Sequence, residues 1–358
     1  MDPKYYFDIY LIIVTLFTLF ITNGIQSDTF LFDKERRQQV PTTLLSLFFI
    51  IFIGFRPISY VFVDMVNYNQ YYNFILGNPF VFTTATDNII FDNLLNYLAG
   101  SYIDIRFLFL FMAALYFTGI VVACNKLFPN NALLAFLVYL AAFSTFSYGT
   151  NGLKAGVAAS LFLIAVAYKQ NKLILILFIL LSFGFHHSMV LPIVAFVMAT
   201  FYKNTKMFLL GWFTCVLISL AHITFFQTLL AGFSDEQGAG YLMSESSDWG
   251  GKTGFRIDFV IYSAMPVLMG YWVIIKQRVE SYMYKFIFNI YLVTNSVWML
   301  CMYAEFTNRI AYLSWFMYPI VLIYPLLRLE VIPNQSVLLK KVVFAHLGFT
   351  LFMHIIYY

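Results

Sequence analysis

Long runs of apolar residues, separated by short polar connections, recur from one end of the chain to the other. A helix needs about 20 apolar residues to cross the hydrocarbon core of a bilayer, and most of these runs are near that length. The pattern predicts an all-α polytopic membrane protein with about twelve transmembrane helices in a single bundle. We expect these helices at residues 6–26, 41–62, 105–125, 131–148, 150–168, 172–185, 187–202, 206–230, 257–275, 283–303, 309–327 and 339–357.

The composition supports this prediction. Hydrophobic residues make up 61% of the 358 residues and charged residues only 11%, whereas a soluble domain has about 25% charged residues. A water-soluble fold could not bury so much apolar surface, so the lipid bilayer is the expected surroundings of one helical domain over residues 1–358. The net charge of +4 is small, and its spread over the connections gives no reason to expect a nucleic-acid partner.

The sequence lacks the common motifs for binding metals and nucleotides. It contains no HExxH or DxD motif and no Cys/His cluster, and its three cysteines have unrelated spacings. Neither GxGxxG nor GxxxxGK[ST] occurs. We therefore expect no metal site and no cofactor.

The basic residues divide unevenly between the two sides that twelve helices would define. Fourteen of the 21 fall on one side and seven on the other, and the richer side is cytoplasmic by the positive-inside rule. Both termini are then expected outside. The outer basic residues are Lys4, Arg56, Arg106, Lys154, Lys252, Arg256 and Arg309.

Two outer connections are long, at residues 63–104 and 231–256. The first contains an amphipathic segment at residues 92–98 that is suited to lie on the membrane surface. The second is rich in glycine, serine and acidic residues, which predicts a mobile loop.

Lys154 and His186 are expected below the outer membrane surface. Lys154 precedes the cytoplasmic Lys169 by fifteen residues, and His186 follows Lys172 by fourteen. Those spacings correspond to about 22 and 21 Å of helix, less than the roughly 30 Å of hydrocarbon. Ionisable groups at such depth are costly and usually functional, so we interpret both as site residues.

Arg56, Arg256 and Arg309 are expected near the outer rim, where with Lys154 they would form an outward-facing basic cluster. Arginine forks bind phosphate oxygens through two hydrogen bonds, so the cluster suits a diphosphate. The alternative is that each arginine only pairs with a nearby carboxylate. The alternative pairs are Arg56 with Asp64, Arg256 with Asp258, and Arg309 with Glu305.

Four segments, in order, resemble the EpsG-like branch of the Wzy-type polysaccharide polymerases. The segment from Arg56 through Asp64 to Tyr68 and Tyr71 is similar to the family's early R…D…Y…Y pattern. Residues 151–158 (NGLKAGVA) resemble its NxxRQGxA helix start, with Lys-Ala in place of Arg-Gln. Residues 181–188 (LSFGFHHS) resemble its FHxS turn, and residues 308–312 its late arginine-containing helix.

The resemblance implies a metal-independent membrane glycosyltransferase. Such an enzyme moves a growing glycan from undecaprenyl diphosphate to the non-reducing end of a new undecaprenyl-diphosphate-linked repeat unit. The reaction takes place on the outer face of the bacterial cytoplasmic membrane, toward the periplasm or the exterior. The donor is already activated, so no nucleotide is needed. A chain-length regulator protein is a candidate partner.

The resemblance and the residue chemistry together suggest roles for the candidate residues. Arg56, Lys154, Arg256 and Arg309 would hold the lipid diphosphate and stabilise its developing charge. His186 titrates near neutral pH, so it would deprotonate the acceptor hydroxyl or orient the group that does. Asp64 is the second candidate base. The tyrosines predicted to stack on sugar faces, or alternatively to anchor the membrane interface, are Tyr68, Tyr71 and Tyr72.

Two other classes of function remain open. A lipid-linked oligosaccharide flippase or transporter would bind the same diphosphate, although no repeat is visible and the charges gather toward one face. An O-antigen ligase would use the same chemistry with a different acceptor. An acyltransferase would need a route for its acyl donor, and no sequence feature indicates one.

Overall fold

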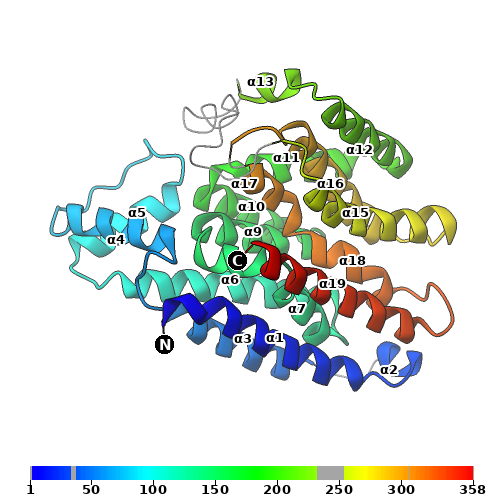
Figure 1. Cartoon of the computed structure of the whole chain (residues 1–358). Helices are drawn as coiled ribbons and strands as arrows, with labels where there is room; N and C mark the ends of the chain where they lie inside the picture. The colour runs from blue at the N-terminus through cyan, green and yellow to red at the C-terminus, as the bar shows by residue number, and fades with distance from the viewer. Residues whose placement is uncertain (1, 34–37, 232–253, 306, 358) are drawn as a thin grey trace. The chain divides into compact units, whose positions relative to one another are not determined.

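The computed structural model describes residues 2–33, 38–231, 254–305 and 307–357, and the regular structure in these ranges is helical without a strand (Figure 1). Five described helices are long and apolar enough to cross a membrane. They are Pro3–Asn23, Arg106–Leu127, Ile257–Lys276, Thr307–Arg328 and Gln335–Ile356. The shorter apolar helices are Gln39–Gly54, Leu153–Ala167, Lys172–Phe185, His187–Phe201 and Thr205–Leu220. The chain is therefore an all-α polytopic membrane protein, and the number of about twelve spans stays a prediction.

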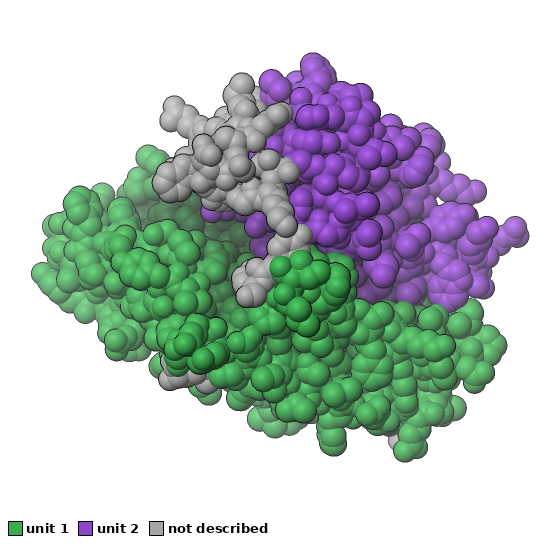
Figure 2. All heavy atoms as spheres, in the orientation of Figure 1, with its two compact units in different colours: residues 1–190, 326–358 green, residues 191–325 purple. Residues whose placement is uncertain are grey.

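The helices form two compact units, coloured separately in Figure 2. Unit 1 comprises residues 1–190 and 326–358, and unit 2 comprises residues 191–325. Each unit is described by itself below.

Helices α6 and α9 form the centre of unit 1. Helix α6 packs against α3 and α9, and α9 packs in turn against α10, while α1 contacts α7 and α19. Nearly every residue of α9 after its first turn is buried, as expected for a helix enclosed by neighbours. The elements of unit 1 are α1 (Tyr6–Asn23), α2 (Asp28–Phe32), α3 (Gln39–Gly54), α4 (Val63–Ile75), α5 (Ile89–Gly100), α6 (Arg106–Leu127), α7 (Ala132–Leu140), α8 (Thr145–Thr150), α9 (Leu153–Ala167), α10 (Lys172–Phe185), the short 3-10 helix η2 (His187–Met189) and α19 (Gln335–Tyr357).

Helix α16 forms the centre of unit 2, where it packs against α12, α15 and α17. Its Asn295 accepts a hydrogen bond from the Trp212 indole at 2.7 Å and donates to the Ser314 hydroxyl at 2.9 Å. Buried polar groups of this kind hold helices together where apolar contact alone is not selective. The elements are α11 (Val190–Phe201), α12 (Thr205–Leu220), α13 (Phe225–Ala231), α15 (Ile257–Tyr271), η3 (Trp272–Lys276), α16 (Tyr282–Leu300), α17 (Thr307–Trp315) and α18 (Tyr318–Arg328), with α11 and α18 crossing the unit boundaries.

Most of the observed helices lie within the predicted apolar runs, but α2, α4 and α5 lie in predicted connections and several predicted helices are interrupted. The run at 41–62 gives a helix only to Gly54, shortly before Arg56-Pro57, because a residue that precedes proline disfavours the helical conformation. The long connection at 63–104, predicted as a loop, contains α4 and α5, and the amphipathic segment at 92–98 is part of α5. The loop predicted at 231–256 lies almost wholly outside the described residues.

The run at 131–148 is divided into α7 and α8, and the freed backbone carbonyls find side-chain donors. The Tyr10 hydroxyl donates to Leu140 O at 2.6 Å, and the Thr350 hydroxyl donates to Ala141 O at 2.7 Å. The Thr145 hydroxyl donates to Tyr139 O at 2.6 Å. A helix break in apolar surroundings is tolerated only when its backbone groups are satisfied in this way. Polar side chains of α1 and α19 therefore provide the hydrogen-bond donors for the carbonyls that the break exposes.

Asp28 caps α19 from a distant part of the sequence. Its two carboxylate oxygens accept the backbone N–H groups of Gln335 at 3.0 Å and Ser336 at 2.7 Å. These bonds, with the Ser336 hydroxyl, lower the pKa of Asp28. We expect Asp28→Ala to destabilise the protein by about 1 kcal/mol, the usual value of such a cap. Melting temperature in detergent measures the effect.

The same cap predicts a pH dependence. Since the pKa of Asp28 is lower in the folded state, its contribution is present above the unfolded pKa of about 4 and is lost as pH falls through the folded value. The difference in melting temperature between the wild type and Asp28→Ala should therefore shrink at acid pH. An undiminished difference there would contradict this role.

Candidate functional site

The predicted site residues fall in both units. Unit 1 holds Arg56, Asp64, Tyr68, Tyr71, Tyr72, Lys154 and His186, and unit 2 holds Arg256 and Arg309. The assembly of the four cations into one cluster stays a prediction. The contacts within each unit define the local chemistry.

Lys154 lies in a polar and aromatic site formed by three helices of unit 1. Its ammonium, in the first turn of α9, lies 4.0 Å from the Asp92 carboxylate of α5. It also lies 5.6 Å from the ring centroid of Tyr68 on α4 and 5.2 Å from that of Phe91 on α5, within the range of cation–π attraction. The two rings are 4.8 Å apart. We call Tyr68, Phe91, Asp92 and Lys154 the lysine site.

Asp92 is the charged member of the lysine site that the sequence did not single out as a site residue. Its side chain is 29% exposed and that of Lys154 is 22% exposed, so both are half-buried yet reachable. Burial raises the pKa of Asp92, and the nearby Asp87 adds to this, whereas Lys154 and the Thr86 hydroxyl act in the opposite direction. The sequence signal available for Asp92 was its position as the carboxylate of the amphipathic segment at residues 92–98.

Gly156 explains why α8 can lie so close to the start of α9. A Cβ at this position would lie 2.6 Å from the backbone oxygen of Tyr148 and 3.2 Å from its carbonyl carbon. The glycine two residues after Lys154 therefore sets the approach of α8 to α9. It belongs to the 151–158 segment that resembled a family motif.

Arg56 is a buried anchor. Its side chain is only 3% exposed, and it donates hydrogen bonds to the carbonyls of Ile53 at 2.7 Å and Thr150 at 3.0 Å. These carbonyls lie at the ends of α3 and α8, where backbone acceptors lack partners within the helix. Its guanidinium lies 5.3 Å from the Phe62 ring centroid, and Asp64 attracts it electrostatically. Arg56 therefore joins two helix ends beside α9.

His186 lies at the junction between α10 and η2. Its Nδ1 accepts the backbone N–H of Ser188 at 3.2 Å and lies 2.7 Å from the Ser188 hydroxyl. An Nδ1 that accepts a hydrogen bond places the proton of neutral imidazole on Nε2. The other ring nitrogen is then a donor. This arrangement favours the second of the two predicted roles, the orientation of another group.

The three tyrosines of α4 differ in their surroundings. Tyr72 is buried, and its hydroxyl donates to Ile103 O at 2.8 Å, which is a structural contact. Tyr68 packs against Phe91 in the lysine site. Tyr71 is 48% exposed, so its ring is available to a ligand or to the membrane interface.

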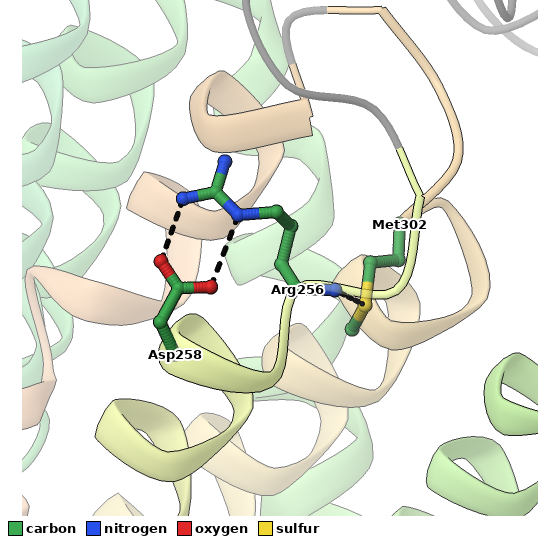
Figure 3. Close-up of polar contacts among 3 residues, drawn as sticks. All are labelled: Arg256, Asp258 and Met302. Atoms are coloured by element: carbon green, nitrogen blue, oxygen red, sulfur yellow. Dashed lines mark hydrogen bonds and ion pairs between the residues drawn. The ribbon is translucent and has the colours of Figure 1, made fainter.

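Arg256 of unit 2 forms a two-fold hydrogen-bonded pair with Asp258 (Figure 3). Its Nε donates to one carboxylate oxygen at 3.0 Å and its Nη2 to the other at 2.7 Å, and the guanidinium lies 3.8 Å from the Phe259 ring centroid. The backbone N–H of Arg256 points to the Met302 sulfur at 3.1 Å. The pairing of Arg256 with Asp258, which is the alternative to diphosphate binding, is present in the structure.

Arg309 is exposed and Glu305 is buried; their pairing stays a prediction. No group of three or more His, Cys, Asp or Glu side chains suited to a metal ion occurs among the described residues.

The family model described as the EpsG family matches residues 40–358, which cover most of the chain and all the candidate site residues. No curated protein matches the chain, and no solved structure matches it.

Proposed function

The chain belongs to the EpsG family, and we propose that it polymerises lipid-linked polysaccharide repeat units as a membrane glycosyltransferase. Membership of the family indicates polysaccharide polymerisation in general. The proposal adds that the growing glycan leaves undecaprenyl diphosphate and joins the non-reducing end of a new lipid-linked repeat unit. The family match over residues 40–358 is the observation that carries the assignment of polysaccharide polymerisation.

The chemistry needs a site that binds and stabilises a diphosphate leaving group. The candidates for this role are Lys154 in unit 1, with Arg56 contributing positive charge from its buried position, and Arg256 and Arg309 in unit 2. Preorganised cations act most strongly where charge develops in the transition state. Arg256 already pairs with Asp258. Its proposed role requires that the diphosphate either displaces the Asp258 carboxylate or shares the Arg256 guanidinium with it.

His186 and Asp64 are the acid–base candidates of this proposal. His186 would donate from Nε2 to a substrate oxygen and so orient the acceptor. Asp64 lies near Arg56 and would act as base only if that attraction is relieved. Tyr68 and Tyr71 would pack against sugar faces.

We propose that the reaction takes place on the outer face of the bacterial cytoplasmic membrane. We propose that both termini lie outside, as the distribution of basic residues predicts. The polyprenyl tails would stay in the bilayer between apolar helices, and a chain-length regulator protein would be a partner.

A strain of the source bacterium that lacks this chain distinguishes the three functional classes. We expect single lipid-linked repeat units to accumulate in the outer leaflet, where a membrane-impermeant oxidant modifies their sugars. Accumulation of protected units in the inner leaflet would indicate a flippase instead. Accumulation of long lipid-linked chains would indicate a ligase. Mass spectrometry of the extracted lipids gives the readout, and restoration by the wild-type gene is the control.

A further inference from the structure

We propose that Asp92 is the general base of the reaction and that the lysine site binds the acceptor sugar. This inference rests on the proposed function and assigns a residue that the candidate set did not include. It places the acceptor hydroxyl between Asp92 and Lys154, beside the half-buried ring of Tyr68.

The first support is the distance between the two charged groups. Oδ1 of Asp92 and Nζ of Lys154 are 4.0 Å apart, too far for a direct hydrogen bond. A hydroxyl oxygen at about 2.8 Å from each group can bridge them. It would donate its hydrogen to the carboxylate and accept one from the ammonium.

The second support is the number of hydrogen-bond donors that the Lys154 ammonium carries. An ammonium has three N–H donors, so Lys154 can donate one to the acceptor oxygen and keep two for the diphosphate. Donation to the oxygen favours its deprotonated form. The same residue thus connects the acceptor to the leaving group proposed above.

The third support is the surroundings of the site. The half-buried ring of Tyr68 lies beside the Lys154 ammonium and packs against the buried ring of Phe91, with the two centroids 4.8 Å apart. An accessible aromatic ring near a carboxylate matches a sugar, which presents apolar C–H faces and polar hydroxyl groups. Asp92 and Lys154 are both partly exposed, so a ligand can reach them.

Helix α5, which carries Asp92, also packs against α10, which ends directly before His186. Gly184 of α10 approaches Ile90 of α5 so closely that a Cβ on Gly184 would lie 2.7 Å from Ile90 Cδ1. Ile90 lies two residues before Asp92, and Gly184 lies two residues before His186. The acceptor-orienting donor and the base therefore come from adjoining elements of unit 1.

The step balances as a single displacement. The acceptor O–H gives its proton to Asp92, and its oxygen forms a bond to the anomeric carbon of the donor. The bond from that carbon to the diphosphate oxygen breaks, and the electron pair leaves with the diphosphate. Water then takes the proton from Asp92.

The direction of the pKa shift agrees with this role. Burial raises the pKa of Asp92, and a base works best when its pKa approaches the working pH. The groups that act on it are Lys154 from α9 and Thr86 and Asp87 before α5, while Tyr68 from α4 packs against the neighbouring Phe91. Polymerisation should fall as pH falls through the pKa of Asp92, because only the ionised carboxylate accepts the proton.

Initial rates with purified variants test the inference. The substrate is the lipid-linked repeat unit extracted from the strain that lacks this chain. We expect Asp92→Asn to lower kcat more than about 100-fold with little change in KM, and Asp92→Glu to restore measurable activity. The matched control Asp87→Asn should keep the rate near neutral pH and move the acid limb of the pH profile to lower pH.

The outcomes separate this inference from the proposed function. A folded Asp92→Asn protein that polymerises within about threefold of wild type would overturn the role of Asp92 alone. A lower melting temperature with an unchanged pH profile of the residual activity would show only a structural link between α5 and α9, which also overturns it. If wild type forms no polymer from this substrate, both proposals fail.

Discussion

Gly156→Ala should destabilise unit 1 and abolish most polymerisation. The new methyl group would meet the backbone oxygen of Tyr148 at 2.6 Å, and a backbone atom cannot rotate away as a side chain can. Overpacking of this kind costs about 1–3 kcal/mol, and relief requires α8 to move from α9. Because Lys154 lies in the first turn of α9, the movement also disturbs the lysine site. Melting temperature in detergent and polymer yield measure the two effects.

Gly348→Ala is the matched control for that substitution. Gly348 lies within α19, and a Cβ there would meet nothing within 4 Å. Alanine favours a helix over glycine by about 1 kcal/mol, so this variant should be as stable as wild type or more stable. Equal melting temperatures for Gly156→Ala and Gly348→Ala would contradict the inference that Gly156 allows α8 to approach α9 so closely.

Arg56→Lys should lower stability by about 3 kcal/mol, although the charge is kept. Lysine cannot reproduce the fork that reaches the carbonyls of Ile53 and Thr150 at 2.7 and 3.0 Å, and each hydrogen bond to a charged group contributes about 1.5–3 kcal/mol. The ammonium of a lysine at this buried position would also have fewer hydrogen-bond partners than the guanidinium has. Polymerisation should fall with stability, because Arg56 fixes the ends of α3 and α8.

The exposed Arg106 gives the control for the arginine substitution, since Arg106→Lys should change stability by less than about 0.5 kcal/mol. The two variants are compared by melting temperature and by KM for the lipid-linked repeat unit. An Arg56→Lys protein with normal stability and a raised KM would mean that Arg56 contacts the diphosphate directly, against the anchor role.

The apolar pattern was sufficient to place most of the apolar helices, but not α4 and α5 or the interruptions of the longer runs. A run such as 131–148 is apolar throughout, and the break after α7 depends on donors from Tyr10 and Thr350. Those donors are distant in sequence, so no local pattern signals them. By contrast, the Arg256–Asp258 pair joins residues two positions apart, and its spacing was visible in the sequence.

In the candidate site, too, single charged residues could be predicted from the sequence, whereas their partners from distant segments could not. Lys154 stood out because a cation at depth is costly, but its partner Asp92 lies 62 positions earlier in a segment predicted as a loop. Arg56 was predicted from its charge, whereas its burial and its carbonyl partners depend on how α3 and α8 meet. Tertiary contacts decide which of the charged residues face a ligand and which hold the fold.

Reconstitution tests the central claim most directly. The purified protein in detergent is mixed with its lipid-linked repeat unit, with a chelator and without nucleotide, and the products are separated on a gel that resolves single repeat units. Metal-independent polymerisation predicts a ladder of glycan lengths that grows with time. Absence of a ladder, with a substrate that membranes containing the protein do polymerise, would contradict the assignment of this chain as the polymerase.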